Sequence, residues 1–291
     1  MNNETKGMLL GVVGISAFGL TLPATRLIAP YLDPIFIGLG RAALAAFFAA
    51  ALLFWFHLKI PTRSQITRLF VVALGVVVGF PVLSTWAMQY VPASHGGVVV
   101  GILPLATALV GVLIGPERPS ISFWIVGILG CGAVITYSFI HGSGDVHRAD
   151  VALLGAIISA AIGYAVGAKL AKEMGGWQVI CWALVLAFPF IIAPTIYFAP
   201  RSMSNISVTT FICFIYLALI SQLFAFFVWY KGLALGGIAR VSQTQLLQPF
   251  ITLFASVILL GEVVGIDTIV FAFVIIALVW IGKSMPVRQK A

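Results

Sequence analysis

Ten apolar segments follow one another along this chain, and each is close to the ~20 residues that an α-helix needs to cross the hydrocarbon core of a bilayer. They lie at about 7–29, 34–57, 66–89, 93–115, 119–140, 150–172, 178–199, 208–231, 238–261 and 264–283. Hydrophobic residues make up 62% of the chain and charged residues 8%, whereas a soluble domain has about 25% charged residues. The sequence therefore predicts an all-α membrane protein with ten transmembrane helices.

The distribution of Lys and Arg predicts how these helices are oriented. With the N-terminus in the cytoplasm, the cytoplasmic ends of the segments hold Lys6, Lys59, Arg63, Arg68, Arg118, Lys169, Lys172, Lys231, Arg240, Lys283, Arg288 and Lys290. The opposite side holds Arg26, Arg148 and Arg201, and Arg41 is left inside the second segment. Because cytoplasmic loops of membrane proteins are enriched in Lys and Arg, we expect both termini in the cytoplasm.

A duplicated Pro and Glu indicate that the two halves of the chain are related. Pro104 and Glu117 are 13 residues apart, and so are Pro249 and Glu262, at an offset of 145 residues. Each half holds five segments, an odd number, so the second half enters the membrane from the opposite side. We therefore predict two inverted five-helix repeats, residues 1–145 and 146–291, a construction common among secondary transporters.

The segment 238–262 carries a polar face that does not suit lipid. Ser242, Gln245, Pro249, Thr252 and Ser256 are spaced by 3, 4, 3 and 4 residues, so they lie on one side of a helix. The equivalent face in the first half is smaller and less polar, and it has Pro104 at the matching point. Such a face indicates a helix that borders a cavity.

Catalytic or metal chemistry has little support in this sequence. The acidic and histidine residues all fall in loops or at the ends of segments, and no metalloprotease, hydrolase or P-loop motif is present. We expect neither an enzyme, nor a metal site, nor a cofactor. The basic residues are scattered between apolar segments, which argues against nucleic acid as a partner. Without a carboxylate deep in a helix, facilitated diffusion is favoured over proton antiport.

The candidate substrate-binding residues are polar or aromatic groups near mid-helix. Glutamine in a membrane helix needs a partner, which is either a substrate or another helix; aromatic side chains can form apolar pocket walls, pack in the core or mark the membrane interface. Small-residue ladders beside Phe18 and Tyr164 predict close helix packing. The predicted substrate-binding residues are Phe18, Leu22, Trp86, His95, Tyr164, Gln222, Gln245 and Gln248.

Three prolines, one histidine and one arginine are further candidate functional residues. Pro23, Pro104 and Pro249 lie within helices and are predicted to act in gating. His95 either faces the outer surface or helps to bind a carboxylate or to gate. Arg41 is expected to extend toward the interface or to pair with Asp33, with a substrate role as the alternative.

These features resemble the drug/metabolite transporter superfamily, and within it the EamA type. The resemblance rests on the two Pro…Glu copies, the glycine-rich segments 7–29 and 150–172, and Arg41. The position equivalent to Arg41 in the second half is Val185. Overall likeness is to YddG-type exporters of aromatic amino acids and related metabolites. The resemblance implies a bacterial inner-membrane carrier in which segments 1, 3, 4, 6, 8 and 9 surround a central cavity and segments 5 and 10 lie outside.

The sequence thus predicts a secondary transporter that exports small metabolites by alternating access. Aromatic and other neutral amino acids are the expected substrates, the lipid bilayer is the expected surrounding, and a monomer is the expected state. Nucleosides, drugs or other metabolites are the alternative substrates. A channel and a membrane-embedded lipid-handling enzyme are the alternatives from other classes.

Overall fold

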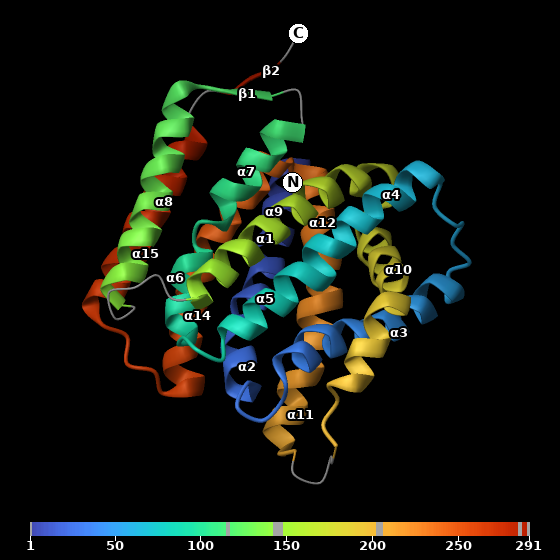
Figure 1. Cartoon of the computed structure of the whole chain (residues 1–291). Helices are drawn as coiled ribbons and strands as arrows, with labels where there is room; N and C mark the ends of the chain where they lie inside the picture. Colours follow the sequence, from blue (N-terminus) through green and yellow to red (C-terminus); the bar gives the residue numbers. More distant parts are fainter. Residues whose placement is uncertain (1, 115–116, 142–147, 202–205, 285–286, 290–291) are drawn as a thin grey trace.

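Helices form nearly all of the first half of the chain in the computed structural model, which describes residues 2–114, 117–141, 148–201, 206–284 and 287–289 (Figure 1). A chain that crosses lipid must satisfy its backbone groups internally, and helices do so within one segment. The elements are α1 (Asn3–Gly19), α2 (Thr21–Ile28), η1 (Phe36–Gly40, π-helical), α3 (Arg41–Trp55), α4 (Arg63–Val72), η2 (Ala73–Gly79, π-helical), α5 (Phe80–Ala87), α6 (Ala93–Val100), α7 (Leu103–Ile114) and α8 (Ile121–His141).

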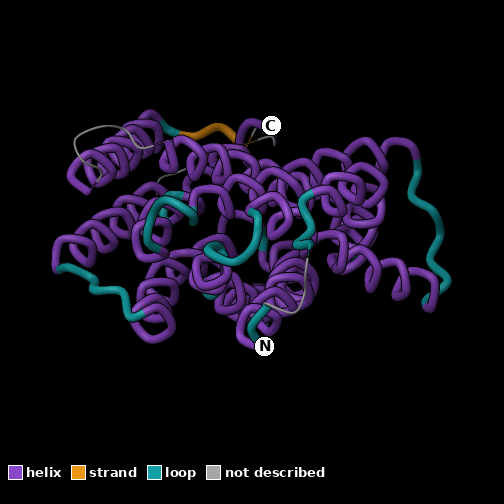
Figure 2. Tube along the Cα trace, turned by 60° about the horizontal axis from the view of Figure 1, so that its bottom comes forward, coloured by secondary structure: helices purple, strands orange, loops and turns teal. Residues whose placement is uncertain are grey.

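The second half is also largely helical, and loops connect the helices along the whole described chain (Figure 2). Its elements are α9 (Arg148–Met174), α10 (Gly176–Tyr197), α11 (Val208–Ile215), η3 (Tyr216–Phe224, π-helical), α12 (Ala225–Gly236), α13 (Ile238–Val241), η4 (Ser242–Leu247, a 3₁₀ helix), α14 (Gln248–Leu260) and α15 (Ile266–Ser284). The expected boundary between residues 145 and 146 lies outside the described residues.

The helical plan, which the sequence predicts, is interrupted by one short ribbon. It pairs β1 (Glu117–Pro119) with β2 (Val287–Gln289) in antiparallel fashion, with Arg118 opposite Arg288. The ribbon links the connection after α7 to the segment after α15. Both strands lie in short links between or beyond helices, so their backbone groups take each other as hydrogen-bond partners.

Seven helices within the described residues are long and apolar enough to cross a membrane. They are Thr5–Ile28, Phe36–Trp55, Arg63–Ala87, Ala93–Ile114, Arg148–Met174, Gly176–Tyr197 and Val208–Gly236. The expected spans 119–140, 238–261 and 264–283 are helical as well, but they are not among these seven, so ten crossings remain a prediction. Helices α8 and α15 pack against each other at one edge of the bundle (Figure 1).

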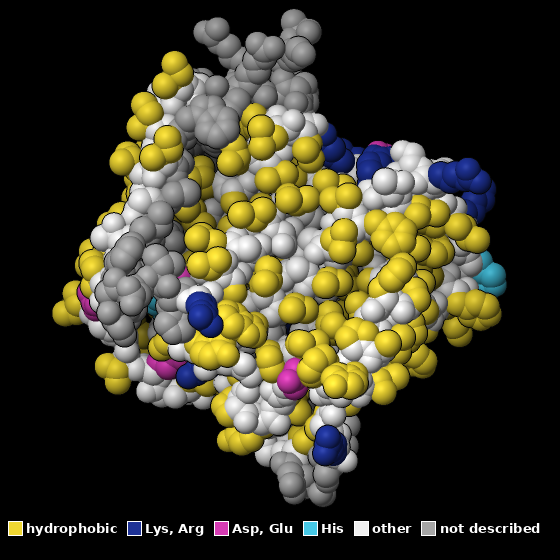
Figure 3. All heavy atoms as spheres, viewed as in Figure 1, with side chains coloured by type: hydrophobic (Ala, Val, Ile, Leu, Met, Phe, Trp, Pro, Cys, Tyr) yellow, Lys and Arg dark blue, Asp and Glu magenta, His cyan; other side chains and the backbone are white. Residues whose placement is uncertain are grey.

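Apolar side chains cover much of the outside of the bundle. Phe47 in α3, Leu74 in η2 and Phe211 in α11 are 69%, 65% and 60% exposed. Hydrophobic side chains spread over most of the face seen in Figure 3, while dark blue Lys and Arg gather toward its margins. A broad exposed apolar surface of this kind marks contact with a membrane rather than with water.

Glycines let α9 approach the π-helical turn η2 very closely. A Cβ built on Gly75 would lie 2.5 Å from the backbone oxygen of Ser159, and one on Gly163 would lie 2.5 Å from Cγ1 of Val76. A Cβ on Gly167 would collide with the Tyr230 ring. The small-residue ladder of α9 is thus the surface on which η2 and α12 pack, as such ladders do in membranes.

We predict that Gly75→Ala destabilises the protein, because the methyl group would collide with backbone that cannot move aside. The expected cost is about 1–3 kcal/mol, measured as a lower melting temperature of the purified protein in detergent. Gly132→Ala in α8 is the control, since no atom lies within 4 Å of the position that its methyl group would take and alanine favours helix. Equal melting temperatures for the two variants would contradict the close packing.

Candidate functional site

A small cavity, about 20 Å³ in volume, lies where helices from both halves of the chain meet. Its position is central, because α1, α2, α3, η2, α5, α9, η3, α12 and α14 all contribute to its wall. The lining residues are Phe18, Thr21, Arg41, Val76, Phe80, Ala160, Tyr164, Ser221, Gln222, Phe226 and Gln248. Helices α6 and α7, which together form the fourth expected segment, supply no lining residue, whereas α3 in the second segment supplies Arg41. The expected set of surrounding segments was therefore wrong for the second and the fourth.

Aromatic side chains form one wall of this cavity. Phe18 and Tyr164 stack with ring centroids 6.2 Å apart and planes at 24°, and Phe18 meets Phe226 edge-on at 4.9 Å. Trp229 closes the cluster behind them, 5.5 Å from Tyr164. Such rings offer flat, apolar surface to a ligand. Because they already contact one another, a bulky substrate must separate them to enter.

Proline shapes the cavity by leaving carbonyl groups without a helical donor. Pro23 has no N–H for the carbonyl of Gly19, which instead accepts the Thr252 hydroxyl at 2.7 Å. The carbonyl of Val76 lies five residues before Pro81 in the π-helical turn η2, and it accepts Nε2 of Gln222 at 2.9 Å. In both cases a side chain of the second half satisfies a backbone group of the first.

Hydroxyl groups strengthen the same junction between the halves. The hydroxyl of Thr21 lies 2.8 Å from that of Ser221, and the Tyr216 hydroxyl donates to the carbonyl of Ala17 at 2.5 Å. Helix α1 ends at Gly19 and α2 begins at Thr21, so these bonds hold the interruption of the first helix against η3.

Within the part of the chain that the structure describes, Arg41 is the charged residue of the cavity lining. Its side chain is buried, and its Nε and Nη1 atoms have no hydrogen-bond partner among the described residues. Asp33 does not pair with it, because Oδ1 of Asp33 caps the next helix by accepting from the N–H of Ile35 at 2.8 Å. The expectations that Arg41 extends to the interface or pairs with Asp33 were therefore wrong. An unpaired buried charge costs on the order of several kcal/mol.

The polar face of the segment 238–262 points inward, as its spacing predicts. Ser242, Gln245, Thr252 and Ser256 are all at most 1% exposed, and Pro249 is buried too. The segment is not one regular helix, since the 3₁₀ helix η4 precedes Pro249. Both amide atoms of Gln245 lack a hydrogen-bond partner within the described residues. Gln245 is thus buried and unsatisfied at a helix interruption, although it does not line the cavity.

At one end of the bundle, which we call the His95 end, α6 is held by two carboxylates. Nε2 of His95 lies 2.6 Å from Oδ1 of Asp150, and both side chains are buried. The carboxylate of Glu262 accepts the N–H groups of Ala93 at 2.8 Å and of Ser94 at 2.9 Å. A carboxylate at a helix N-terminus is favourable for both hydrogen bonding and the helix dipole.

These contacts correct two expectations. His95 does not face the surface, and Asp150 is a buried carboxylate inside the first turn of α9. Facilitated diffusion was favoured because no buried carboxylate was expected, and that reason no longer holds.

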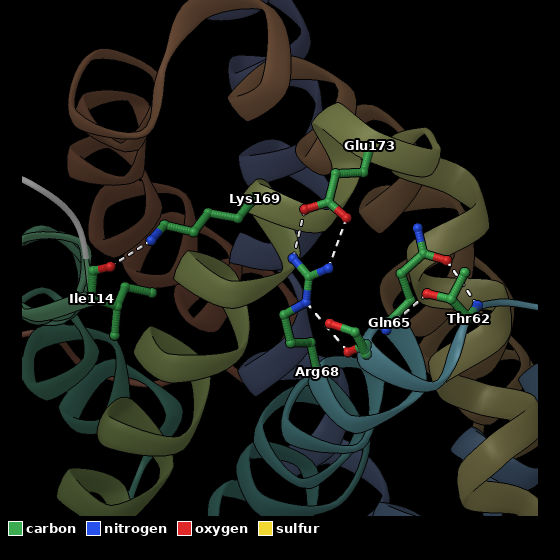
Figure 4. A network of polar contacts seen from close by, with 7 residues as sticks. Thr62, Gln65, Arg68, Ile114, Lys169 and Glu173 are labelled. Carbon is green, nitrogen blue, oxygen red and sulfur yellow. Dashed lines mark hydrogen bonds and ion pairs between the residues drawn. The ribbon is translucent and has the colours of Figure 1, made fainter.

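The opposite end, which we call the Arg68 end, is closed by contacts to the last turns of α9. The guanidinium of Arg68 in α4 makes a two-pronged ion pair with Glu173, at 2.6 and 2.8 Å (Figure 4). Nζ of Lys169 donates to the carbonyl of Ile114 at the end of α7, at 2.5 Å. Helix α9 is thus tied to α6 at one end and to α4 and α7 at the other.

The remaining predicted residues lie in several surroundings. Phe18, Tyr164, Gln222 and Gln248 meet at the cavity, while Leu22 is buried beside the position of Gly96. The Trp86 ring contacts that of Tyr90 at 4.8 Å, with the two planes tilted by 53°, toward the end of α5 and away from the cavity. Pro23, Pro104 and Pro249 each follow a helix interruption by one to three residues.

Sequence reasoning missed several parts of the site. Trp229 and Tyr230 are fully buried, not at the interface, and the Tyr230 hydroxyl donates to the carbonyl of Gly163 at 3.1 Å. Thr21, Ser221 and Phe226 were not singled out. Each of the three lies within about one helical turn of a predicted substrate-binding residue, and this proximity in the sequence could have identified them.

These observations define a multi-pass membrane protein built around a small central cavity with aromatic and polar walls, as expected of a carrier. The chain belongs to the EamA-like transporter family, which matches it twice, over residues 5–139 and 147–281. It is therefore a membrane transporter and not an enzyme. It is 44% identical to the Uncharacterized transporter YdeK of Bacillus subtilis (strain 168) over 265 residues, 91% of this chain and 92% of the relative.

A solved structure shares the fold. It is a crystal structure of a protein that superposes with a TM-score of 0.67, at 14% sequence identity, over 97% of this chain and 96% of its own. At that identity the likeness concerns the arrangement of the helices alone.

We predict that Gln245→Leu leaves stability unchanged or raises it, because no hydrogen bond is lost and a buried unsatisfied amide is removed. Gln222→Leu is the matched variant. It removes the donor to the Val76 carbonyl and is expected to cost about 1–3 kcal/mol. Melting temperatures in detergent compare the two, and a greater loss for Gln245→Leu would reveal a partner for its amide.

Proposed function

We propose that this protein exports small metabolites from bacterial cells by alternating access, and that aromatic and other neutral amino acids are the leading substrates. The observation that carries the proposal is the central cavity, which combines an aromatic wall with Arg41, hydroxyl groups and amides. Binding sites for small molecules commonly have this composition, with mostly apolar walls and a few placed polar groups.

The proposed architecture is ten transmembrane helices in two inverted five-helix repeats, residues 1–145 and 146–291. The two family matches and the matching π-helical turns η2 and η3 support it, since residues 73–79 shifted by 145 become 218–224, inside 216–224. The distribution of Lys and Arg supports cytoplasmic termini. The inner membrane and the monomeric state are part of the same proposal.

Alternating access requires the two ends of the bundle to open one at a time. The ties at the His95 end and at the Arg68 end are both formed in this structure, and the cavity between them is closed. Opening the His95 end would part α6 from α9 and from Glu262. Opening the Arg68 end would part α4 and α7 from the last turns of α9. The helix interruptions before Pro104 and Pro249 are the proposed pivots.

We expect purified protein in liposomes to move labelled phenylalanine or tryptophan down a gradient with saturable kinetics. Saturation follows because a carrier exposes one site per cycle, whereas a channel would give flux that rises in proportion to concentration. Liposomes without protein are the control. Flux no greater than in those liposomes would contradict the substrate assignment, and unsaturated flux would favour a channel.

The buried His95–Asp150 pair makes proton coupling the better expectation. Its two side chains share one short hydrogen bond, the Tyr137 ring lies 5.1 Å from that of His95, and the Glu262 carboxylate binds the N–H of the residue before His95. A proton taken up by the pair would alter the contact that joins α6 to α9. Coupling would thus act at the contact that must break when this end opens.

We predict that a pH gradient drives uphill accumulation of substrate in these liposomes, and that Asp150→Asn abolishes accumulation but retains exchange of labelled for unlabelled substrate. The amide keeps the shape of the side chain and removes its negative charge. Glu173→Gln at the Arg68 end is the control and should still accumulate substrate. Accumulation by Asp150→Asn equal to that of the unmodified protein would rule out the pair as the coupling site.

A further inference from the structure

The guanidinium of Arg41 is the least satisfied charged group of the described structure. It is 1% exposed, it lines the central cavity, and two of its nitrogen atoms, Nε and Nη1, have no hydrogen-bond partner among the described residues. Charged side chains inside membrane helices are costly, and they commonly face a substrate path and pair there with an opposite charge. The observation therefore calls for a partner that the described part of the chain does not supply.

Among the described residues, no Asp or Glu lines the cavity beside Arg41. The eleven lining residues include no Asp and no Glu. The acidic side chains whose contacts are known are engaged elsewhere: Asp33 caps a helix, Asp150 holds His95, Glu173 pairs with Arg68, and Glu262 caps α6. The cavity thus has one positive charge and no compensating negative charge in its lining, so a negatively charged ligand group suits it.

The chemistry around Arg41 narrows the kind of anion. A guanidinium binds a carboxylate through two parallel hydrogen bonds, and a single guanidinium balances one negative charge. Phe18, Tyr164 and Phe226 surround the same space with flat apolar surface. The remaining polar side chains of the lining are neutral, so they suit neutral groups of a ligand rather than a second charge.

We propose that Arg41 binds the carboxylate of the substrate, and that the site prefers monocarboxylates with an aromatic or apolar body over zwitterionic amino acids. A protonated amino group would meet no carboxylate in the lining and would be repelled by Arg41. Amino acids still bind through their carboxylate, but more weakly, and amines that lack a carboxylate do not bind. This inference rests on the proposed transport function and specifies the substrate class of the same cavity.

Three compounds with one benzyl group in common test the preference: phenylpyruvate, phenylalanine and phenethylamine. Ligand-induced rise of the melting temperature of the purified full-length protein reports binding. We expect phenylpyruvate to raise the melting temperature at concentrations at least about tenfold below those that phenylalanine requires. Phenethylamine should leave the melting temperature unchanged. Equal or stronger action of phenylalanine, or any action of phenethylamine at the same concentrations, would overturn the proposal.

Variants of Arg41 test the residue itself. Arg41→Gln should weaken phenylpyruvate binding by at least about 30-fold. Arg41→Lys keeps the charge but not the two-pronged geometry, so its affinity for phenylpyruvate should lie between those of Arg41→Gln and the unmodified protein. Without ligand, Arg41→Gln should melt no lower than the unmodified protein, because an unpaired charge is removed. Undiminished binding, or a lower melting temperature that shows a structural role for the guanidinium, would overturn the assignment.

Arg63→Gln is the matched control. It removes an exposed arginine at the start of α4 that takes no part in the contacts at either end of the bundle, and it should leave the affinity for phenylpyruvate unchanged. A different result would contradict the proposed transport function itself: none of the three compounds would show saturable flux in liposomes. Saturable flux of phenylalanine together with an intact Arg41→Gln variant would leave transport standing and remove the carboxylate site.

Discussion

Backbone hydrogen bonding in a medium without water is the constraint on which this structure depends. A continuous helix satisfies it alone, but a proline leaves one carbonyl without a donor. Here Gly19 and Val76, both in the first half, have carbonyls freed in this way, and both accept side chains of the second half, Thr252 and Gln222. The interruptions that create the cavity are therefore stable only when the two halves are assembled. Packing of the halves and formation of the site are one event.

The same bonds limit how the halves can move. If α14 moved away from α1, the carbonyl of Gly19 would lose the Thr252 hydroxyl in a region where water cannot replace it. The contacts at the two ends of α9 are of a different kind. Arg68 and Glu173 form a partly exposed ion pair that water can replace, whereas His95 and Asp150 form a buried pair. The hydrogen bonds between the two halves at the centre are thus expected to persist, whereas the contacts at the two ends are the ones expected to open.

Much of the fold follows from residue spacing, and the errors have physical causes. The polar face from Ser242 to Ser256 is buried because its spacing holds even through a 3₁₀ turn. Arg41 was misplaced because the π-helical turn η1 directly before it shifts the helix face by one residue, which no periodicity in the sequence shows. Asp150 was correctly placed at the end of a segment, but its burial was missed, since apolar segments do not tell how far a neighbouring helix such as α6 covers the start of α9.

The repeat explains the scaffold but not the charge of the site. Phe18 of one half and Tyr164 of the other form a stacked pair, and the π-helical turns η2 and η3 correspond. At the position equivalent to Arg41, however, the second half has Val185, so one half supplies a cation and the other does not. In the proposed inverted-repeat architecture, one charge that lies off the symmetry axis would fix the direction in which a polar substrate lies. If the guanidinium holds one end of the substrate, the two openings would release it in different orientations, and the barriers for the two directions need not be equal.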